Sequence, residues 1–291
     1  MKIGLVGLGE MGTPMAAALA RAGLLAAVHS ADTAHTQAVA SEHKIFAVGS
    51  AGALWDHCDV VLLCLPNDGE VQAVARALAL PAASGKTVVD SSTVAPDTAV
   101  EVAALLGKVG ARFLDAPING NAETARHARL TFMVGGSEAD YAAMTPLFAA
   151  LGHALRIGNV GSGQAVKAVN QAATAGIAKA VTEALAFSQA LELPLHAVIE
   201  ALSSGAAASW FDRHAESQTV GGRYLRGLKV AVMHKDLTIC QQLAAQAGGN
   251  LPTVDVALAQ YQTLIAEGRG EEDISSIYRL NRRLFPDNGW F

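Results

Sequence analysis

The sequence predicts a doubly wound α/β domain over residues 1–161 and an all-helical domain over residues 162–291, which begins with a long linking helix. The first observation is length, because 291 residues suffice for about two domains of ~100–200 residues each. The second is that strand and helix patterns alternate through the first half of the chain. The third is that only helical patterns follow.

In the first half, short apolar segments alternate with longer amphipathic ones. Strands are expected at residues 3–6, 24–28, 59–65, 87–90, 112–115 and 131–134. Helices are expected at residues 10–22, 70–78, 97–106 and 138–151. Strands that alternate with helices form βαβ units, so we expect a parallel sheet covered by helices on both faces.

A long helix is predicted over residues 164–193, which contain no proline and a single glycine, Gly176. At about 1.5 Å per residue, this helix would be about 45 Å long. Its abundant alanine predicts burial on several sides. Shorter helices are expected after it, separated by breaks at Pro194, Gly205, Gly221–Gly222, Gly248–Gly249 and Pro252. The change of pattern places the domain boundary at residues 158–164.

Composition excludes several classes of protein. Hydrophobic residues make up 51% of the chain and charged residues 16%, which rules out a disordered polypeptide. The net charge of -5 offers no basic field for nucleic acid or an anionic membrane. The apolar run at residues 60–66 is far below the ~20 residues that span a bilayer. The three cysteines form no CxxC pattern, which favours free thiols in the cytoplasm.

A glycine pattern follows the first predicted strand, in the segment Gly7-Leu8-Gly9-Glu10-Met11-Gly12. In a G-x-G-x-x-G turn the first glycine permits the tight turn, and the second lets the backbone approach a pyrophosphate. The third lets the helix pack on the strand, and the helix N-terminus offers N–H groups to the phosphates. The pattern predicts dinucleotide binding, with a purely structural strand-to-helix turn as the alternative.

The residue at the end of the second strand discriminates between NAD and NADP. An acidic residue there binds the ribose 2′-hydroxyl, and a basic residue accommodates a 2′-phosphate. This chain has Ser30 at that position, with Asp32 two residues later and no arginine following. NAD and NADP both stay open, and the absence of a carboxylate at position 30 slightly favours NADP.

Polar and turn-forming residues follow three further predicted strands. These segments are Leu65-Pro66-Asn67, Ser91-Ser92-Thr93 and Asp115-Ala116-Pro117-Ile118-Asn119-Gly120. Ligands of open α/β sheets bind outside the carboxyl ends of the strands, which makes these segments candidate binding loops. Ordinary turn chemistry is the alternative for each of them taken singly.

Lys167 is the candidate for proton transfer. It is the one charged residue in an otherwise uncharged stretch, residues 164–171, near the start of the long helix. Asn170 follows at i+3 and therefore shares its helix face. A solvated surface lysine is the alternative. Lys235, which precedes Asp236, is consistent with either a site residue or an exposed helix face.

Four motifs in order resemble the β-hydroxyacid dehydrogenase family. They are the segment from Gly7 to Ala16, the segment from Asp115 to Gly120, Gly161-Ser162-Gly163 with Lys167 and Asn170, and Lys235-Asp236-Leu237. The resemblance covers nearly the whole chain. It implies an N-terminal Rossmann domain, a helical C-terminal domain and reversible hydride transfer between NAD(P) and a small 3-hydroxy acid or its semialdehyde.

The same resemblance implies residue roles. Lys167 would act as general acid/base, with Asn170 beside it. Thr93 and Lys235 would lie near the nicotinamide or its ribose. Independently of the resemblance, the positions of Ser30, Leu65 and Pro66 after their strands predict that they contact the cofactor. The substrate carboxylate would be held by Asn119, Gly120 and Asn121. The family has serine and two glycines there, followed by further glycines, so residues 119–126 predict an altered substrate preference.

Alternative functions keep parts of this pattern. One is a reductase of the same architecture that acts on another carbonyl or an imine, and another is a non-catalytic dinucleotide-binding module. A metalloenzyme is disfavoured because the nine histidines are scattered, so we expect no metal site. We expect a small-molecule carboxylate substrate and no nucleic-acid or membrane partner. The apolar helical half predicts a homodimer or homotetramer.

Overall fold

The computed structural model describes residues 1–205, 208, 222, 224 and 227–285. The chain divides into two compact units, residues 1–167 and residues 168–291. The division falls within helix α8 (Ser162–Ala190), so the first turns of that helix belong to the first unit.

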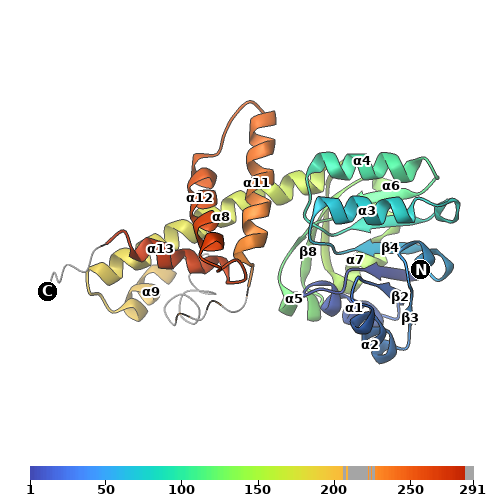
Figure 1. Ribbon diagram of the computed structural model, residues 1–291, viewed down its shortest axis with the longest axis horizontal. Helices are drawn as coiled ribbons and strands as arrows, with labels where there is room; N and C mark the ends of the chain where they lie inside the picture. The colour runs from blue at the N-terminus through green and yellow to red at the C-terminus, as the bar shows by residue number, and fades with distance from the viewer. Residues whose placement is uncertain (206–207, 209–221, 223, 225–226, 286–291) are drawn as a thin grey trace. The chain divides into compact units, whose positions relative to one another are not determined.

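The first unit is built around a nine-stranded sheet (Figure 1). Its strands are β1 (Ile3–Val6), β2 (Leu25–His29), β3 (Phe46–Ala47), β4 (Val60–Leu63), β5 (Thr87–Asp90), β6 (Arg112–Asp115), β7 (Ile118–Asn119), β8 (Leu130–Gly135) and β9 (Gly152–Gly158). Six of them run parallel in the order β3-β2-β1-β4-β5-β6. The order reverses between β1 and β4, which confirms the doubly wound α/β prediction.

The far edge of the sheet differs from the wholly parallel sheet that the sequence predicted. Strand β8 runs antiparallel to both β6 and β7, and parallel to β9. The connection from β7 to β8 spans only residues 120–129, whereas a parallel crossover needs a dozen or more residues. The short connection therefore reverses the chain at this edge.

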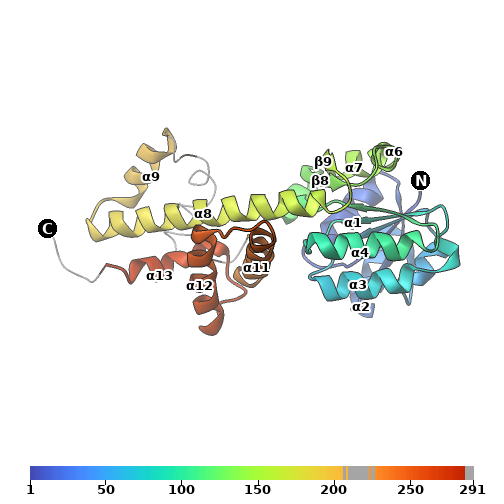
Figure 2. The ribbon, with the colours of Figure 1, turned by 90° about the horizontal axis from the view of Figure 1, so that it is seen from above.

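Helices cover both faces of the sheet, as predicted (Figures 1 and 2). They are α1 (Gly12–Arg21), α2 (Thr33–His43), α3 (Asp68–Leu78), α4 (Pro96–Gly107), α5 (Ala122–Arg126), α6 (Glu138–Ala143) and α7 (Thr145–Leu151), with short 3-10 helices at Gly52–Asp56 and Pro81–Ala83. Successive side chains of β4 point to opposite faces of the sheet and so enter different core layers. Leu62 packs in the core with α1, α2 and α7, and Leu63 packs in the core with α3 and α4.

Two predictions about helices need correction. The single helix expected at residues 138–151 is two helices, α6 and α7, which meet at Met144. Pro146 stands in the first turn of α7, where its missing N–H group is tolerated but an uninterrupted helix is not. Helix α2 went unpredicted because it buries only three of its residues and has almost no apolar stripe.

The second unit is helical where the structure describes it. It contains α8 from residue 168 onward, α9 (Leu195–Ser203), α11 (Val230–Gln246), α12 (Pro252–Ala266), the 3-10 helix η4 (Ile274–Ile277) and α13 (Tyr278–Arg282). Its core joins Ala175 of α8, Leu237 of α11 and Tyr261 of α12. Of the predicted breaks, Gly221 lies outside the described residues.

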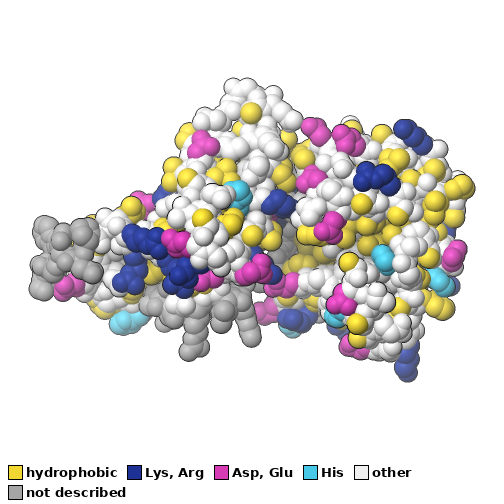
Figure 3. Space-filling model, in the orientation of Figure 1, with side chains coloured by type: hydrophobic (Ala, Val, Ile, Leu, Met, Phe, Trp, Pro, Cys, Tyr) yellow, Lys and Arg dark blue, Asp and Glu magenta, His cyan; other side chains and the backbone are white. Residues whose placement is uncertain are grey.

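Surface features agree with the low charge density of the sequence. On the face of the first unit that Figure 3 shows, charged side chains of both signs are scattered among apolar ones. Among the helices of the described residues, none has the length and apolar character needed to cross a membrane.

Candidate functional site

The glycine turn between β1 and α1 has the geometry of a dinucleotide-binding loop. Gly7 has a φ of +96°, and a Cβ atom there would overlap the carbonyl oxygen of Cys64. A Cβ atom at Gly12 would overlap the carbonyl oxygen of Gly7, whereas one at Gly9 would meet no atom within 4 Å. Met11, at the N-cap of α1, makes no side-chain cap hydrogen bond. The open space over Gly9 and the uncapped helix end fit a pyrophosphate.

Ser30 follows β2 and belongs to a small hydroxyl cluster. Its Oγ lies 2.7 Å from Oγ1 of Thr36 and donates to the backbone oxygen of Asp32 at 3.1 Å. The Asp32 carboxylate caps α2 by accepting the N–H of His35 at 2.9 Å. Nε2 of His35 lies 3.1 Å from Oγ1 of Thr13 on α1, which holds the start of α2 beside the glycine turn.

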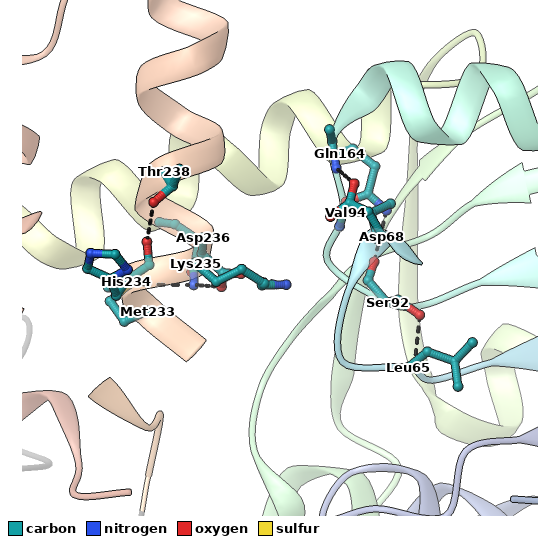
Figure 4. Close-up of polar contacts among 12 residues, drawn as sticks. Leu65, Asp68, Ser92, Val94, Gln164, Met233, His234, Lys235, Asp236 and Thr238 are labelled. Atoms are coloured by element: carbon teal, nitrogen blue, oxygen red, sulfur yellow. Dashed lines mark hydrogen bonds and ion pairs between the residues drawn. The ribbon is translucent and has the colours of Figure 1, made fainter. Parts of the chain in front are cut away.

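Hydrogen bonds join the loops that follow β4 and β5. The N–H of Leu65 donates to Oγ of Ser92 at 2.9 Å (Figure 4). Oδ1 of Asp68 accepts the N–H of Ala95 at 2.8 Å and the hydroxyl of Thr98 at 2.7 Å. These contacts fix the carboxyl end of β5 against that of β4, on the edge where ligands of such sheets bind.

Asp115, the last residue of β6, caps the long helix α8. Its Oδ1 accepts the N–H of Gly161 at 2.8 Å, and its Oδ2 accepts the N–H of Gln164 at 2.9 Å. The carboxylate thereby satisfies N–H groups that the first turn of a helix leaves unpaired. Burial raises the pKa of Asp115 above its usual range, and the N–H groups of Gly161 and Gln164 oppose that rise.

A second buried carboxyl lies in register with Asp115 across the sheet. Asp90 ends β5 and is fully buried, and its Oδ1 accepts the N–H of Ser92 at 2.9 Å. Burial raises the pKa of Asp90 to about 7, the hydrogen bonds from Ser92 lower it, and the charges of Asp115 and Asp68 raise it further. The Asp90 carboxyl therefore titrates near neutral pH behind the loop that carries Thr93.

Gln164 connects α8 to that loop. Its side chain is buried, and both ends of its amide are hydrogen-bonded. Nε2 donates to the backbone oxygen of Ser92 at 2.8 Å, and Oε1 accepts the N–H of Val94 at 3.2 Å (Figure 4). The half-buried Thr93 stands between these two attachment points.

Lys167 lies on α8, three residues after Gln164, so the two residues share a helix face. Only 8% of Lys167 is exposed, which is unusual for a lysine without a specific role. Asn170 is half-buried, and its Nδ2 donates to Oε1 of Gln171 at 3.1 Å. A solvated surface lysine, the alternative interpretation of Lys167, does not match this burial.

Lys235 lies on α11 in the second unit and is half-buried. Its Nζ forms an ion pair with Oδ1 of Asp236 at 3.1 Å. Figure 4 shows both side chains on this helix. Oδ2 of Asp236 accepts a hydrogen bond of 2.7 Å from Nε2 of Gln171, which joins α11 to α8.

The predicted carboxylate-binding segment ends β7 and begins α5. Asn119 is exposed and pairs with Thr131 of β8. Gly120 has a φ of +145°, and a Cβ atom there would come within 2.5 Å of Oγ1 of Thr124. Asn121 forms a capping box with Thr124: its side-chain oxygen accepts the N–H of Thr124 at 2.9 Å, and its own N–H donates to Oγ1 of Thr124 at 2.7 Å.

Two family models match successive parts of the chain. The NAD binding domain of 6-phosphogluconate dehydrogenase matches residues 2–161. The NAD-binding domain of NADP-dependent 3-hydroxyisobutyrate dehydrogenase matches residues 161–281. The 2-hydroxy-3-oxopropionate reductase of Escherichia coli (strain K12) is 32% identical over 284 residues, which are 95% of this chain and 96% of that protein. The chain belongs to the β-hydroxyacid dehydrogenase family.

A solved structure and a second sequence relative support the same assignment. The structure of 3-hydroxyisobutyrate dehydrogenase from Mycobacterium tuberculosis with L-serine has a TM-score of 0.88 and 27% identity, and the match covers 97% of this chain and 99% of that one. The mitochondrial 3-hydroxyisobutyrate dehydrogenase of Drosophila melanogaster is 30% identical, over 97% of this chain and 89% of that protein. As a β-hydroxyacid dehydrogenase, this protein is an oxidoreductase that uses NAD or NADP.

The structure of this β-hydroxyacid dehydrogenase gathers many of the predicted site residues at the carboxyl edge of the sheet in the first unit. They are Gly7–Gly12, Ser30, Leu65–Pro66, Thr93 and Asn119–Asn121. Asn119 lies at this edge because β7 runs in the same direction as β6. Lys167 is the last residue of the first unit, and Asn170 and Lys235 belong to the second.

Sequence reasoning missed two residues that organise this edge, Asp115 as the cap of α8 and Gln164 as the link to the β5 loop. Asp115 was noted as part of a strand end and of a family motif, but not as a helix cap. A polar residue buried in an apolar helix turn was the available signal for Gln164, but its partners are 70 and 72 residues away in the chain.

Proposed function

We propose that this β-hydroxyacid dehydrogenase interconverts a small 3-hydroxy acid and its semialdehyde, with Lys167 as the general acid/base. The observation that carries the proposal is the burial of Lys167 on the helix that Asp115 and Gln164 attach to the cofactor edge. In oxidation a neutral Lys167 amine would take the hydroxyl proton, and in reduction its ammonium would return one. The nicotinamide would accept or supply the hydride.

Cofactor binding is assigned to the edge of the first unit. Gly7, Leu8, Gly9, Glu10, Met11 and Gly12 would hold the pyrophosphate, as the open space over Gly9 supports. Ser30 would face the ribose 2′ position, and its lack of charge favours NADP. Leu65, Pro66 and Thr93 would line the nicotinamide half. For Lys235 a role at the cofactor rests on the family resemblance.

The substrate carboxylate is assigned to Asn119, Gly120 and Asn121. Amide N–H groups and a backbone N–H at a glycine are donors suited to a carboxylate. Relatives named for 2-hydroxy-3-oxopropionate and 3-hydroxyisobutyrate place small hydroxy acids and semialdehydes first among the candidates. Asn170 would orient Lys167 or donate to the substrate oxygen.

A paired assay tests the proposal. Small 3-hydroxy acids are offered with NAD⁺ and NADP⁺, and semialdehydes, ketoacids and cyclic imines with NADH and NADPH. We expect turnover of a hydroxy acid–semialdehyde pair, with NADP(H) preferred. Turnover of imines alone would support a reductase of the same architecture instead. Cofactor binding without turnover of any substrate would support a non-catalytic module.

Lys167→Ala isolates the proton-transfer step. We expect kcat to fall by roughly 10²–10⁴-fold, because that is the usual contribution of a general acid/base, while cofactor binding stays within a few-fold. Lys179→Ala is the matched control, since Lys179 lies on the same helix but pairs with Glu183 at its surface. Turnover of Lys167→Ala equal to that of Lys179→Ala would remove Lys167 from the mechanism.

Assembly and location are proposals as well. We propose a homodimer or homotetramer, because Val169, Ile177 and Phe187 expose large apolar side chains along α8. Light scattering that gives a monomer mass at micromolar concentration would contradict this. We propose a cytoplasmic location because Cys58, Cys64 and Cys240 are free thiols.

A further inference from the structure

We propose that Gln164 is a positioning residue that holds Thr93 and Lys167 in one fixed arrangement at the cofactor edge. The proposal rests on the proposed function for the roles of Thr93 and Lys167. Gln164 is assigned no contact with substrate or cofactor, and it acts through the backbone on both sides of Thr93.

Both ends of the Gln164 amide are hydrogen-bonded to the Thr93 loop. Only 1% of the residue is exposed. Its Nε2 donates to the Ser92 oxygen and its Oε1 accepts the Val94 N–H, so the amide brackets Thr93 from both sides. Supplying one donor and one acceptor in this way requires an amide or a neutral carboxylic acid. Leucine has a similar volume and supplies neither group.

The segment that Gln164 holds is attached elsewhere too. The Ser92 N–H donates to Asp90. The Ser92 hydroxyl accepts the N–H of Leu65 (Figure 4). The backbone N–H of Gln164 donates to Asp115. The ends of β4, β5 and β6 are thereby connected to the first turn of α8. If the Thr93 loop moved relative to the first turn of α8, the two hydrogen bonds of the Gln164 side-chain amide would break.

Lys167 depends on the same attachment. It follows Gln164 by three residues, so a shift of the first turn of α8 moves the Lys167 ammonium relative to Thr93. Misplacing a reacting group by about 1 Å can cost a factor of about 10² in rate. Gln164 therefore governs the alignment of the proton-transfer group with the residue that we assign to the nicotinamide.

Two variants test this inference. Gln164→Leu removes both side-chain hydrogen bonds of Gln164 and should lower kcat by about 10–100-fold. It should also weaken NADPH binding at least about threefold, because the Thr93 loop is held less firmly. Gln164→Glu restores both bonds only when its carboxyl is protonated. Its activity relative to that of Gln164→Leu should therefore rise as the pH is lowered from 9 to 6.

The groups that surround position 164 bear on this pH dependence. They are Asp90 at the end of β5, Asp115 at the end of β6, Asp68 at the start of α3 and Lys167 on α8 itself. All four are present in both variants, so the ratio of the two activities isolates the carboxyl at position 164. A ratio that stays constant from pH 9 to pH 6 would overturn the inference.

Thr182→Val is the control for stability. Thr182 lies on the same helix, and its buried Oγ1 accepts a hydrogen bond of 2.9 Å from Asn281 in the second unit. Loss of this hydrogen bond should lower the unfolding midpoint, as Gln164→Leu does. It should leave kcat and NADPH binding unchanged. If Gln164→Leu behaves like Thr182→Val, Gln164 is merely structural and the inference fails.

Failure of the proposed function would be seen separately. If Lys167→Ala keeps full turnover, or if no substrate is turned over, the proposed function fails whatever Gln164 does. NADPH binding, measured by nicotinamide fluorescence in the absence of substrate, then decides the inference. Gln164→Leu must weaken that binding relative to Thr182→Val, and equal affinities would overturn the role of Gln164.

Discussion

The side-chain amide of Gln171 donates a hydrogen bond of 2.7 Å to the carboxylate of Asp236. The other oxygen of the carboxylate forms an ion pair with Lys235, and Oε1 of Gln171 accepts a hydrogen bond from Asn170. Asn170 and Lys235, two residues that we assign to the site, are thus connected through one buried carboxylate. In the second unit, the Asp236 carboxylate therefore links α11 to α8.

Asp236→Ala should destabilise the protein by about 1–3 kcal/mol, because it leaves the buried amide of Gln171 without its acceptor. Asp236→Asn keeps an acceptor for Gln171 and loses only the ion pair, so its loss should be smaller. Urea unfolding measures both. The surface pair Lys179–Glu183 provides the comparison, since Glu183→Ala should cost at most about 0.5 kcal/mol. Equal stabilities for Asp236→Ala and Glu183→Ala would contradict the role of Asp236.

The glycine turn allows folding and cofactor binding to be separated. Gly9→Ala places its Cβ in open space, so the unfolding free energy without cofactor should change by less than about 0.5 kcal/mol. The same methyl group stands where the pyrophosphate must approach the backbone, so NADPH affinity should fall at least about tenfold.

Gly12→Ala is the opposite case. Its Cβ would overlap the carbonyl oxygen of Gly7, so the variant should lose about 1–3 kcal/mol of stability before any ligand is added. Thermal unfolding with and without NADPH measures both effects. Undiminished NADPH affinity in Gly9→Ala would show that the dinucleotide does not lie over this turn.

Features of the fold that depend on residues close together in the sequence could be predicted from it. The turn from Gly7 to Gly12, the alternation of strands with helices and the long helix α8 all follow from local spacing. Strand β9 could not be predicted in this way, because most of its side chains are exposed and no apolar alternation marks it. The two helices that replace the expected 138–151 helix follow from Pro146, a signal that was present but unused.

The site was predictable as a set of residues but not as a network. Lys167 stood out because its neighbours are uncharged, and Asn119–Asn121 because the family has other residues there. The bonds that organise them join positions far apart in the chain, such as Asp115 to Gln164 and Gln171 to Asp236. Such pairings arise when strand ends and helices meet in space, and no spacing in the sequence encodes them.

The buried carboxyl of Asp90 makes stability depend on pH. Its pKa is raised to about 7 in the folded protein, chiefly by burial, whereas an aspartate in an unfolded chain titrates near 3.9. Between these values the folded protein holds a proton at Asp90 that the unfolded chain has released. Raising the pH through this window therefore favours unfolding, by up to about 1.4 kcal/mol for each pH unit, and the effect levels off above pH 7.

Asp90→Asn resembles the protonated carboxyl at every pH and can still accept the N–H of Ser92 through its side-chain oxygen. The variant should match the wild type in stability near pH 4, exceed it increasingly up to about pH 7, and keep that advantage with little further change at pH 8. Urea unfolding without cofactor across this range measures the difference, from which other titrating groups cancel. Asp56→Asn, at an exposed position, should show no such divergence. If the two Asn variants behave alike at pH 8, the Asp90 carboxyl is not held protonated by its burial.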